Sequence, residues 1–114
     1  MKKILIAVDG SEFSEKAFKH SLAEAKKRED SITILQVVPG FGLAGVVPEK
    51  GREDEIKNAE EFTEKLKAEA EEEGVNVDAE VITGENIANS IVKFADDANY
   101  DLIVVGSRGK SDLP

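Results

Sequence analysis

The stretch DLIVVGSRGKS (Asp101–Ser111) joins an apolar run to a glycine-rich turn. An apolar run with β-branched members that ends at a glycine predicts a buried strand leading into a turn. The turn closes with Gly109, Lys110 and Ser111, as a phosphate-binding P-loop does, but a P-loop has four residues between its first glycine and that triad. Val104 stands where that glycine belongs, so the sequence excludes a P-loop and predicts a different strand-to-glycine turn.

Similar apolar runs recur along the chain and alternate with helical patterns. We expect strands at residues 4–8, 31–38, 75–81 and 102–105, and helices near residues 12–28, 49–73 and 87–99. Strands that alternate with helices of this length predict parallel strands joined by right-handed crossovers. The predicted fold is therefore an open, Rossmann-like α/β sheet. The third strand alternates apolar and polar residues, which favours an edge position.

The ends of these strands hold the polar and glycine-rich segments. Asp9 and Gly10 follow the first strand, Val37 to Pro39 end the second, and the Gly106–Gly109 turn follows the fourth. Ligands of open α/β sheets bind in the crevice outside the carboxyl ends of the strands. We therefore expect these segments to meet at one edge and to form a binding site.

Composition limits the remaining possibilities. The 114 residues suffice for a single domain over 1–114, and no apolar run is long enough to span a bilayer. The chain has no cysteine, which agrees with a cytoplasmic protein. A formal net charge of −9 argues against nucleic acid as a partner, because such binding depends on clustered Lys and Arg.

The acidic charge is concentrated between residues 49 and 73, with eleven acidic and five basic side chains. Apolar residues recur there every three or four positions, which predicts an amphipathic helix with a solvated acidic face. This face is either a solubility surface or an acidic docking surface. The preceding stretch, PGFGLAGVVPEKG (Pro39–Gly51), is long for a connection, so we expect a lid, a partner contact or a flexible loop.

Three segments in this order resemble the universal stress protein family: KILIAVDGS (Lys3–Ser11), ITILQVV (Ile32–Val38) and YDLIVVGSRG (Tyr100–Gly109). The resemblance covers essentially the whole chain. It implies a fold like that of the adenine nucleotide alpha hydrolases, with strand order 3-2-1-4-5, and a protein that is often a homodimer. It also implies the ATP-binding branch, which carries Gly-x-x-Gly, nine residues, and then Gly followed by Ser or Thr.

The resemblance assigns site residues by position. Ala7, Val8 and Asp9 would line the adenine and ribose side, and the backbone of Val37 would bind adenine. The segment beneath the ribose and phosphates would comprise Val105, Gly106, Arg108, Gly109, Lys110 and Ser111. The expected ligand is ATP, with Mg²⁺ or Mn²⁺ as its companion ion, and Asp9 would either hydrogen-bond to the ribose or assist that ion.

One part of the family pattern lies beyond this sequence. The second Gly-Ser/Thr would follow Pro114, as would the final helix and strand. We therefore expect a chain that is truncated at its carboxyl end.

Several residues also have purely structural interpretations. Gly106 and Gly109 could simply permit a tight turn, and Asp9 could cap the first helix. His20 has no cysteine or second histidine beside it, which favours a surface or core residue over a ligand.

Three functions fit the sequence. The first is a nucleotide-binding regulatory stress protein that holds ATP with slow hydrolysis or none, because no nucleophile and base are visible together. The second is a dimerisation or protein-interaction module on the same fold. The third, an adenylating enzyme, fits least well because such enzymes usually carry a Ser-Gly-Gly-x-Asp-Ser loop after the first strand. Here Asp9–Ser14 stands there instead and puts two carboxylates close to where a pyrophosphate would lie.

Overall fold

The computed structural model describes residues 1–40 and 49–106. The elements alternate as predicted: β1 (Lys3–Val8), α1 (Glu12–Arg28), β2 (Ser31–Pro39), α2 (Glu49–Glu72), β3 (Val77–Gly84), α3 (Ile87–Asp97) and β4 (Leu102–Gly106). The helix and strand expected after Gly106 lie outside the described residues, as do residues 41–48, where most of the proposed lid falls.

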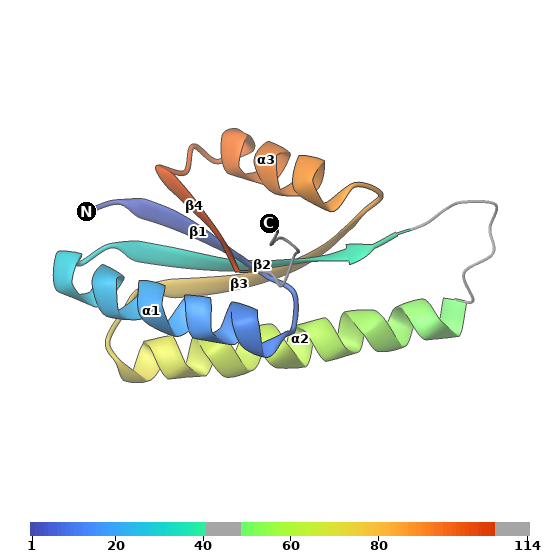
Figure 1. The fold of residues 1–114 in the computed structure, drawn as a ribbon, viewed down its shortest axis with the longest axis horizontal. Coiled ribbons are helices and arrows are strands. Elements are labelled where there is room, and N and C mark those ends of the chain that lie inside the picture. The colour runs from blue at the N-terminus through green and yellow to red at the C-terminus, as the bar shows by residue number, and fades with distance from the viewer. Residues whose placement is uncertain (41–48, 107–114) are drawn as a thin grey trace, which may run out of the picture.

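The strands form one parallel sheet with the order β3-β2-β1-β4. This order confirms the expected 3-2-1-4 arrangement and the open α/β fold. Helices α1 and α2 cover one face of the sheet, and α3 covers the other (Figure 1). After β3, at one edge of the sheet, the chain returns to the far side of β1 and forms β4 there. Strand β1 therefore lies between β2 and β4.

Each face of the sheet has its own hydrophobic core. On the α1 and α2 face, fully buried Ile6, Phe18 and Leu66 belong to the larger cluster. On the α3 face, Leu5 and Leu35 pack with Ile91 of the helix. Successive residues of β1 thus point to opposite faces, and this is why its sequence is a continuous apolar run rather than an alternating one.

The burial of β4 differs from the prediction. Its sequence indicated a buried strand, but Leu102 is 45% exposed, Ile103 37% and Val105 58%. The physical reason is position: β4 pairs only with β1 among the described residues, so its other edge has no neighbouring strand there. The edge position predicted for β3 is confirmed.

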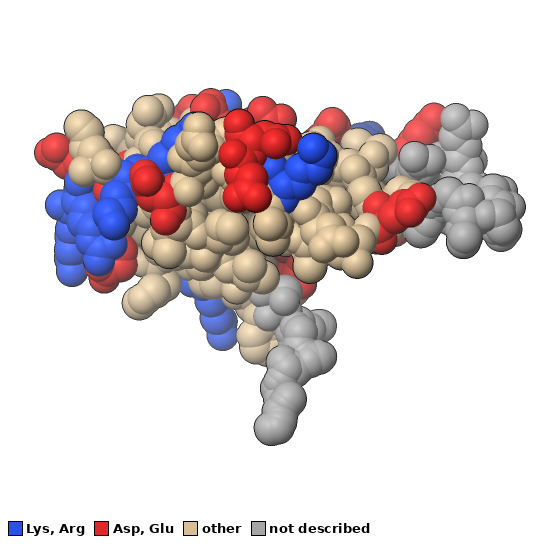
Figure 2. Space-filling model, turned by 90° about the horizontal axis from the view of Figure 1, so that it is seen from above, with Lys and Arg blue, Asp and Glu red and all other residues tan. Residues whose placement is uncertain are grey.

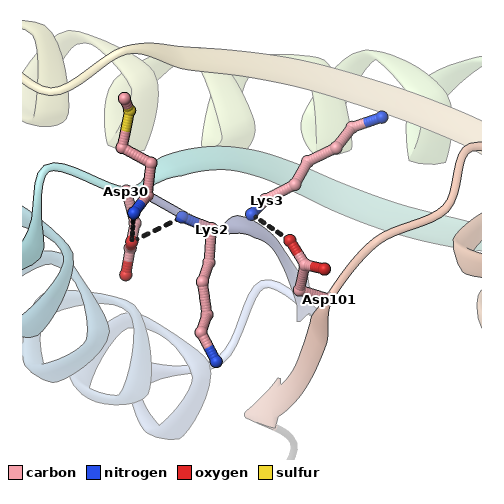
Figure 3. Close-up of polar contacts among 5 residues, drawn as sticks. Lys2, Lys3, Asp30 and Asp101 are labelled. Atoms are coloured by element: carbon pink, nitrogen blue, oxygen red, sulfur yellow. Dashed lines mark hydrogen bonds and ion pairs between the residues drawn. The ribbon is translucent and has the colours of Figure 1, made fainter.

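At the amino edge of the sheet, two aspartates bind the start of β1 (Figure 3). The backbone N–H of Lys2 donates to Asp30 Oδ1 at 2.7 Å, and the backbone N–H of Lys3 donates to Asp101 Oδ2 at 2.8 Å. Asp30 precedes β2 and Asp101 precedes β4, so the pair ties the central strand to both of its neighbours.

Ion pairs connect α1 with α2. Glu15 Oε2 of α1 lies 3.2 Å from Lys65 Nζ of α2 and 3.6 Å from Lys19 Nζ of its own helix. The hydrogen bond from Lys65 is the largest cause that lowers the pKa of Glu15 from its usual 4.5, and the charges of Lys65 and Lys19 lower it further against partial burial. Lys26 and Glu73 form a second link at 2.7 Å.

We expect Glu15→Gln to lower the free energy of unfolding by less than about 1 kcal/mol at neutral pH, since the ion pair is partly exposed. The folded state lowers the pKa of Glu15, so its contribution is present above 4.5 and is lost as pH falls through the lower folded value. Urea unfolding in an acidic pH series should therefore show the two proteins converging. Glu64→Gln, at an exposed position of α2, is the control; an equal deficit there would contradict the assignment.

Candidate functional site

The register of the sheet brings three strand ends to one edge. Val8 of β1 is paired with Gln36 of β2 on one side and with Gly106 of β4 on the other. The residues that follow Val8 and Gln36 in the chain are Asp9 and Val37, so they lie at the same carboxyl edge. The structure thus brings together the predicted residues Ala7, Val8, Asp9, Val37, Val105 and Gly106. Arg108, Gly109, Lys110 and Ser111 lie outside the described residues.

Among the described residues, two clefts open at this edge. The first, here called the α2 cleft, has a volume of about 450 Å³ and lies between the end of β2, the turn after β1 and helix α2. Its polar lining residues are Asp9, Gln36, Glu55 and Asn58. Its remaining lining residues are Gly10, Val37, Val38, Pro39, Ala59, Phe62 and Ile87.

The second cleft, here called the α3 cleft, has a volume of about 400 Å³ and lies between β1, β4 and α3. Asp9 is its only charged lining residue among those described; the others are Ala7, Val8, Ile87, Ala88, Ile91, Val92, Ile103 and Val105. Asp9 and Ile87 border both clefts, so the two form one divided, partly apolar depression. Clefts of this size and lining are typical of small-molecule sites.

The turn after β1 has a defined hydrogen-bond pattern. Ser11, not Asp9, is the N-cap of α1: its hydroxyl oxygen accepts from the backbone N–H of Ser14 at 3.1 Å. Asp9 Oδ1 in turn accepts from the backbone N–H of Ser11 at 3.0 Å and from its hydroxyl. The capping alternative for Asp9 is therefore wrong, and this aspartate instead holds the cap residue while it borders both clefts.

Gly106 is required by the packing of α1. A Cβ atom at this position would stand 2.6 Å from the Cβ of Ala17 and 3.1 Å from the Cα of Ser14. No other residue type fits without a shift of the helix or the strand. The glycine therefore lets β4 end directly against the first turns of α1.

The sequence reasoning missed the residues that other elements bring to the edge. Glu55, Asn58 and Phe62 come from α2, and Ile87 begins α3. No local signal marks these residues, because their place depends on helix packing. Gln36 did carry a signal: it interrupts the apolar end of β2, next to the predicted adenine contact Val37.

The basic residues at the end of α1 lie away from both clefts. Lys26, Lys27 and Arg28 lie in the last turn of α1, and Figure 2 shows blue atoms concentrated at that end of the molecule. A cleft of about 590 Å³ also lies there, at the amino edge beside Lys2, Asp30 and Asp101. Its aspartates bind the start of β1. Because ligands of open α/β sheets bind at the carboxyl edge, this cleft at the amino edge does not correspond to the predicted binding site.

Two further expectations can be compared with the described residues. His20 is exposed on α1. Within residues 1–40 and 49–106, no three or more His, Cys, Asp and Glu side chains are grouped as metal ligands. Over the same part of the chain, every helix is too short or too polar to cross a membrane.

The family model described as "Universal stress protein family" matches residues 1–114. The chain belongs to the universal stress protein family. The resemblance drawn from the three sequence segments is thereby confirmed, and the protein is a stress protein of this family. It is similar to universal stress protein MJ0531 of Methanocaldococcus jannaschii, with 37% identity over 98% of this chain and 68% of that one. YxiE of Bacillus subtilis is also 37% identical, over 97% of this chain and 82% of that one.

Solved structures of family members share the fold. A Burkholderia pseudomallei protein superposes with a TM-score of 0.84 at 22% identity, over 93% of this chain and 81% of that one. An Arabidopsis thaliana member, solved with AMP bound, has a TM-score of 0.75 at 22% identity, over 96% of this chain and 78% of that one. A universal stress protein in complex with cAMP has a TM-score of 0.76 at 18% identity, over 98% and 80% of the two chains.

Proposed function

We propose that this universal stress protein binds an adenine nucleotide, ATP in the first place, at the carboxyl edge of its sheet and acts as a stress-response regulator. The observation that carries the proposal is the register of Val8 with Gln36 and Gly106, which sets Asp9 and Val37 at two adjoining clefts and the end of β4 at the same edge. Family members with the same fold have been solved with AMP and with cAMP.

The chemistry of the edge fits a nucleotide. The α3 cleft offers apolar walls to a base, while the α2 cleft offers hydrogen-bonding groups to a base edge or a sugar. Gly106 leads into the Ser-Arg-Gly-Lys-Ser sequence, whose positive charges and glycine suit phosphates. Asp9 is the residue that we propose to assist a Mg²⁺ or Mn²⁺ ion carried by the nucleotide, and that ion would neutralise the phosphate charge.

We propose binding without catalysis. Asp9 Oδ1 accepts hydrogen bonds from Ser11, so this carboxylate is engaged in the turn rather than set beside a nucleophile. In this proposal the protein is cytoplasmic and homodimeric.

The second candidate function is a protein-interaction module. It is favoured by the exposed apolar side chains on α3 and β4, of which Val92 is 52% and Val105 58% exposed. Exposed apolar patches mark interaction sites more often than scattered single residues do.

The nucleotide proposal predicts that Ala88→Trp weakens AMP and ATP binding at least about tenfold, because a tryptophan at this exposed helix position fills the α3 cleft. Isothermal titration calorimetry measures the effect. Ala68→Trp, at an exposed position of α2 that borders neither cleft, is the matched control. Unmodified protein that takes up no ATP, ADP or AMP would leave the interaction module as the better proposal.

A further inference from the structure

Gln36 has an unusual environment at the end of β2. It lines the α2 cleft, and its amide oxygen Oε1 is buried without a hydrogen-bond partner among the described residues. Its amide nitrogen lies toward the turn after β1, 3.6 Å from where a Cβ atom at Gly10 would stand. Buried polar groups are nearly always hydrogen-bonded, so we expect a hydrogen-bond donor near the Oε1 atom of Gln36.

The other polar residues of the α2 cleft are more open to water. Asp9, Glu55 and Asn58 are exposed, whereas Gln36 is half-buried. Hydrogen bonds shielded from water discriminate between ligands most strongly, since an analogue that lacks the donor leaves a buried group unpaired. Among the described lining residues, Gln36 is therefore best placed to set the specificity of this cleft.

The charges around the cleft indicate which ligand groups fit it. Asp9 and Glu55 bring two carboxylates, and none of its described lining residues is Lys, Arg or His. The Lys and Arg of the last turn of α1 lie toward the opposite edge, at the end of the molecule where Figure 2 shows blue atoms. A phosphate here would meet like charge, whereas N–H and O–H groups would meet acceptors. In an adenine nucleotide, such donors are the exocyclic amine of the base and the ribose hydroxyls.

We propose that Gln36 is a specificity-determining residue whose Oε1 accepts a hydrogen bond from one of these donors. The inference rests on the proposed nucleotide function and adds to it the group that is recognised. The last torsion of a glutamine side chain is broad, so a partial rotation of the amide turns the oxygen toward the cleft. A bound donor then satisfies an acceptor that has no partner in the described residues.

Calorimetry with four probes tests this inference: AMP, inosine monophosphate, which lacks the amine, and 2′-deoxy-AMP and 3′-deoxy-AMP, which each lack one hydroxyl. We expect AMP to bind about tenfold more tightly than the analogue that lacks the recognised donor. The weakened analogue identifies the source as base or ribose. Gln36→Met keeps the length of the side chain but has no amide, so it should bind AMP about tenfold more weakly and lose the preference.

Thr33→Val is the control variant, because it removes a polar group from the same strand at a position bonded to Tyr100 and outside the cleft. It should retain the preference, and thermal unfolding shows whether both variants are folded. If Gln36→Met keeps the preference, or if unmodified protein binds all four probes equally, the role of Gln36 is overturned and the proposed function stands. If unmodified protein binds neither AMP nor ATP, both fail.

Discussion

Replacing Gly106 with alanine is expected to lower the free energy of unfolding by about 1–3 kcal/mol, the usual effect of forcing an extra carbon into a packed core. The new Cβ would stand 2.6 Å from the Cβ of Ala17 and 3.1 Å from the Cα of Ser14, both in α1. Ser14 is fully buried, so α1 must move away from β4. Urea unfolding followed by circular dichroism measures the loss.

A double-mutant cycle separates this clash from a general effect of the substitution. In an Ala17→Gly background the closest contact is absent, so Gly106→Ala should cost less than in the unmodified protein, although the contact with Ser14 remains. Val105→Ala, at the 58% exposed neighbouring position, should change stability little. Equal costs of Gly106→Ala in both backgrounds would show that the close approach to α1 does not determine the effect.

The strand order and the exposure of β4 show how far the sequence predicts this fold. The order of strands and helices, the parallel sheet and the exposed β3 edge all follow from local patterns that the structure confirms. The exposure of β4 does not follow, because an apolar sequence such as Val104-Val105 is equally typical of a central strand. Among the described residues, β4 pairs with β1 on one side only. Burial depends on the neighbours of a strand, and these are set by the whole chain.

The candidate site shows the same division. Strand ends in a parallel sheet meet at one edge, so the convergence of Asp9, Val37 and Gly106 was predictable from chain order. The part played by Asp9 was not predictable, because Asp9 and Ser11 both stand in the short turn before α1 and only the geometry selects Ser11 as the N-cap. The wall that α2 adds to the cleft depends on how a long amphipathic helix lies across the sheet, which its sequence does not specify.

The second large effect is expected at the opposite edge, where two aspartates make the same bond in different surroundings (Figure 3). Asp30→Ala should lower the free energy of unfolding by about 1–3 kcal/mol, because its side chain is 1% exposed and its loss leaves the N–H of Lys2 without that acceptor in a partly buried place. Asp101→Ala removes an equivalent bond to Lys3 at an exposed position, where water replaces the carboxylate. Its expected cost is below about 1 kcal/mol.

Asp30→Asn distinguishes the hydrogen bond from the charge. Asparagine keeps an oxygen that can accept from Lys2, so it should retain more stability than alanine does if the bond dominates. If charge dominates, through the amino-terminal ammonium 4.0 Å away, Asn and Ala should be equally destabilised. Chemical unfolding of the three variants beside the unmodified protein decides this. Equal losses for Asp30→Ala and Asp101→Ala would contradict the argument that burial makes Asp30 the stronger of the two attachments of β1.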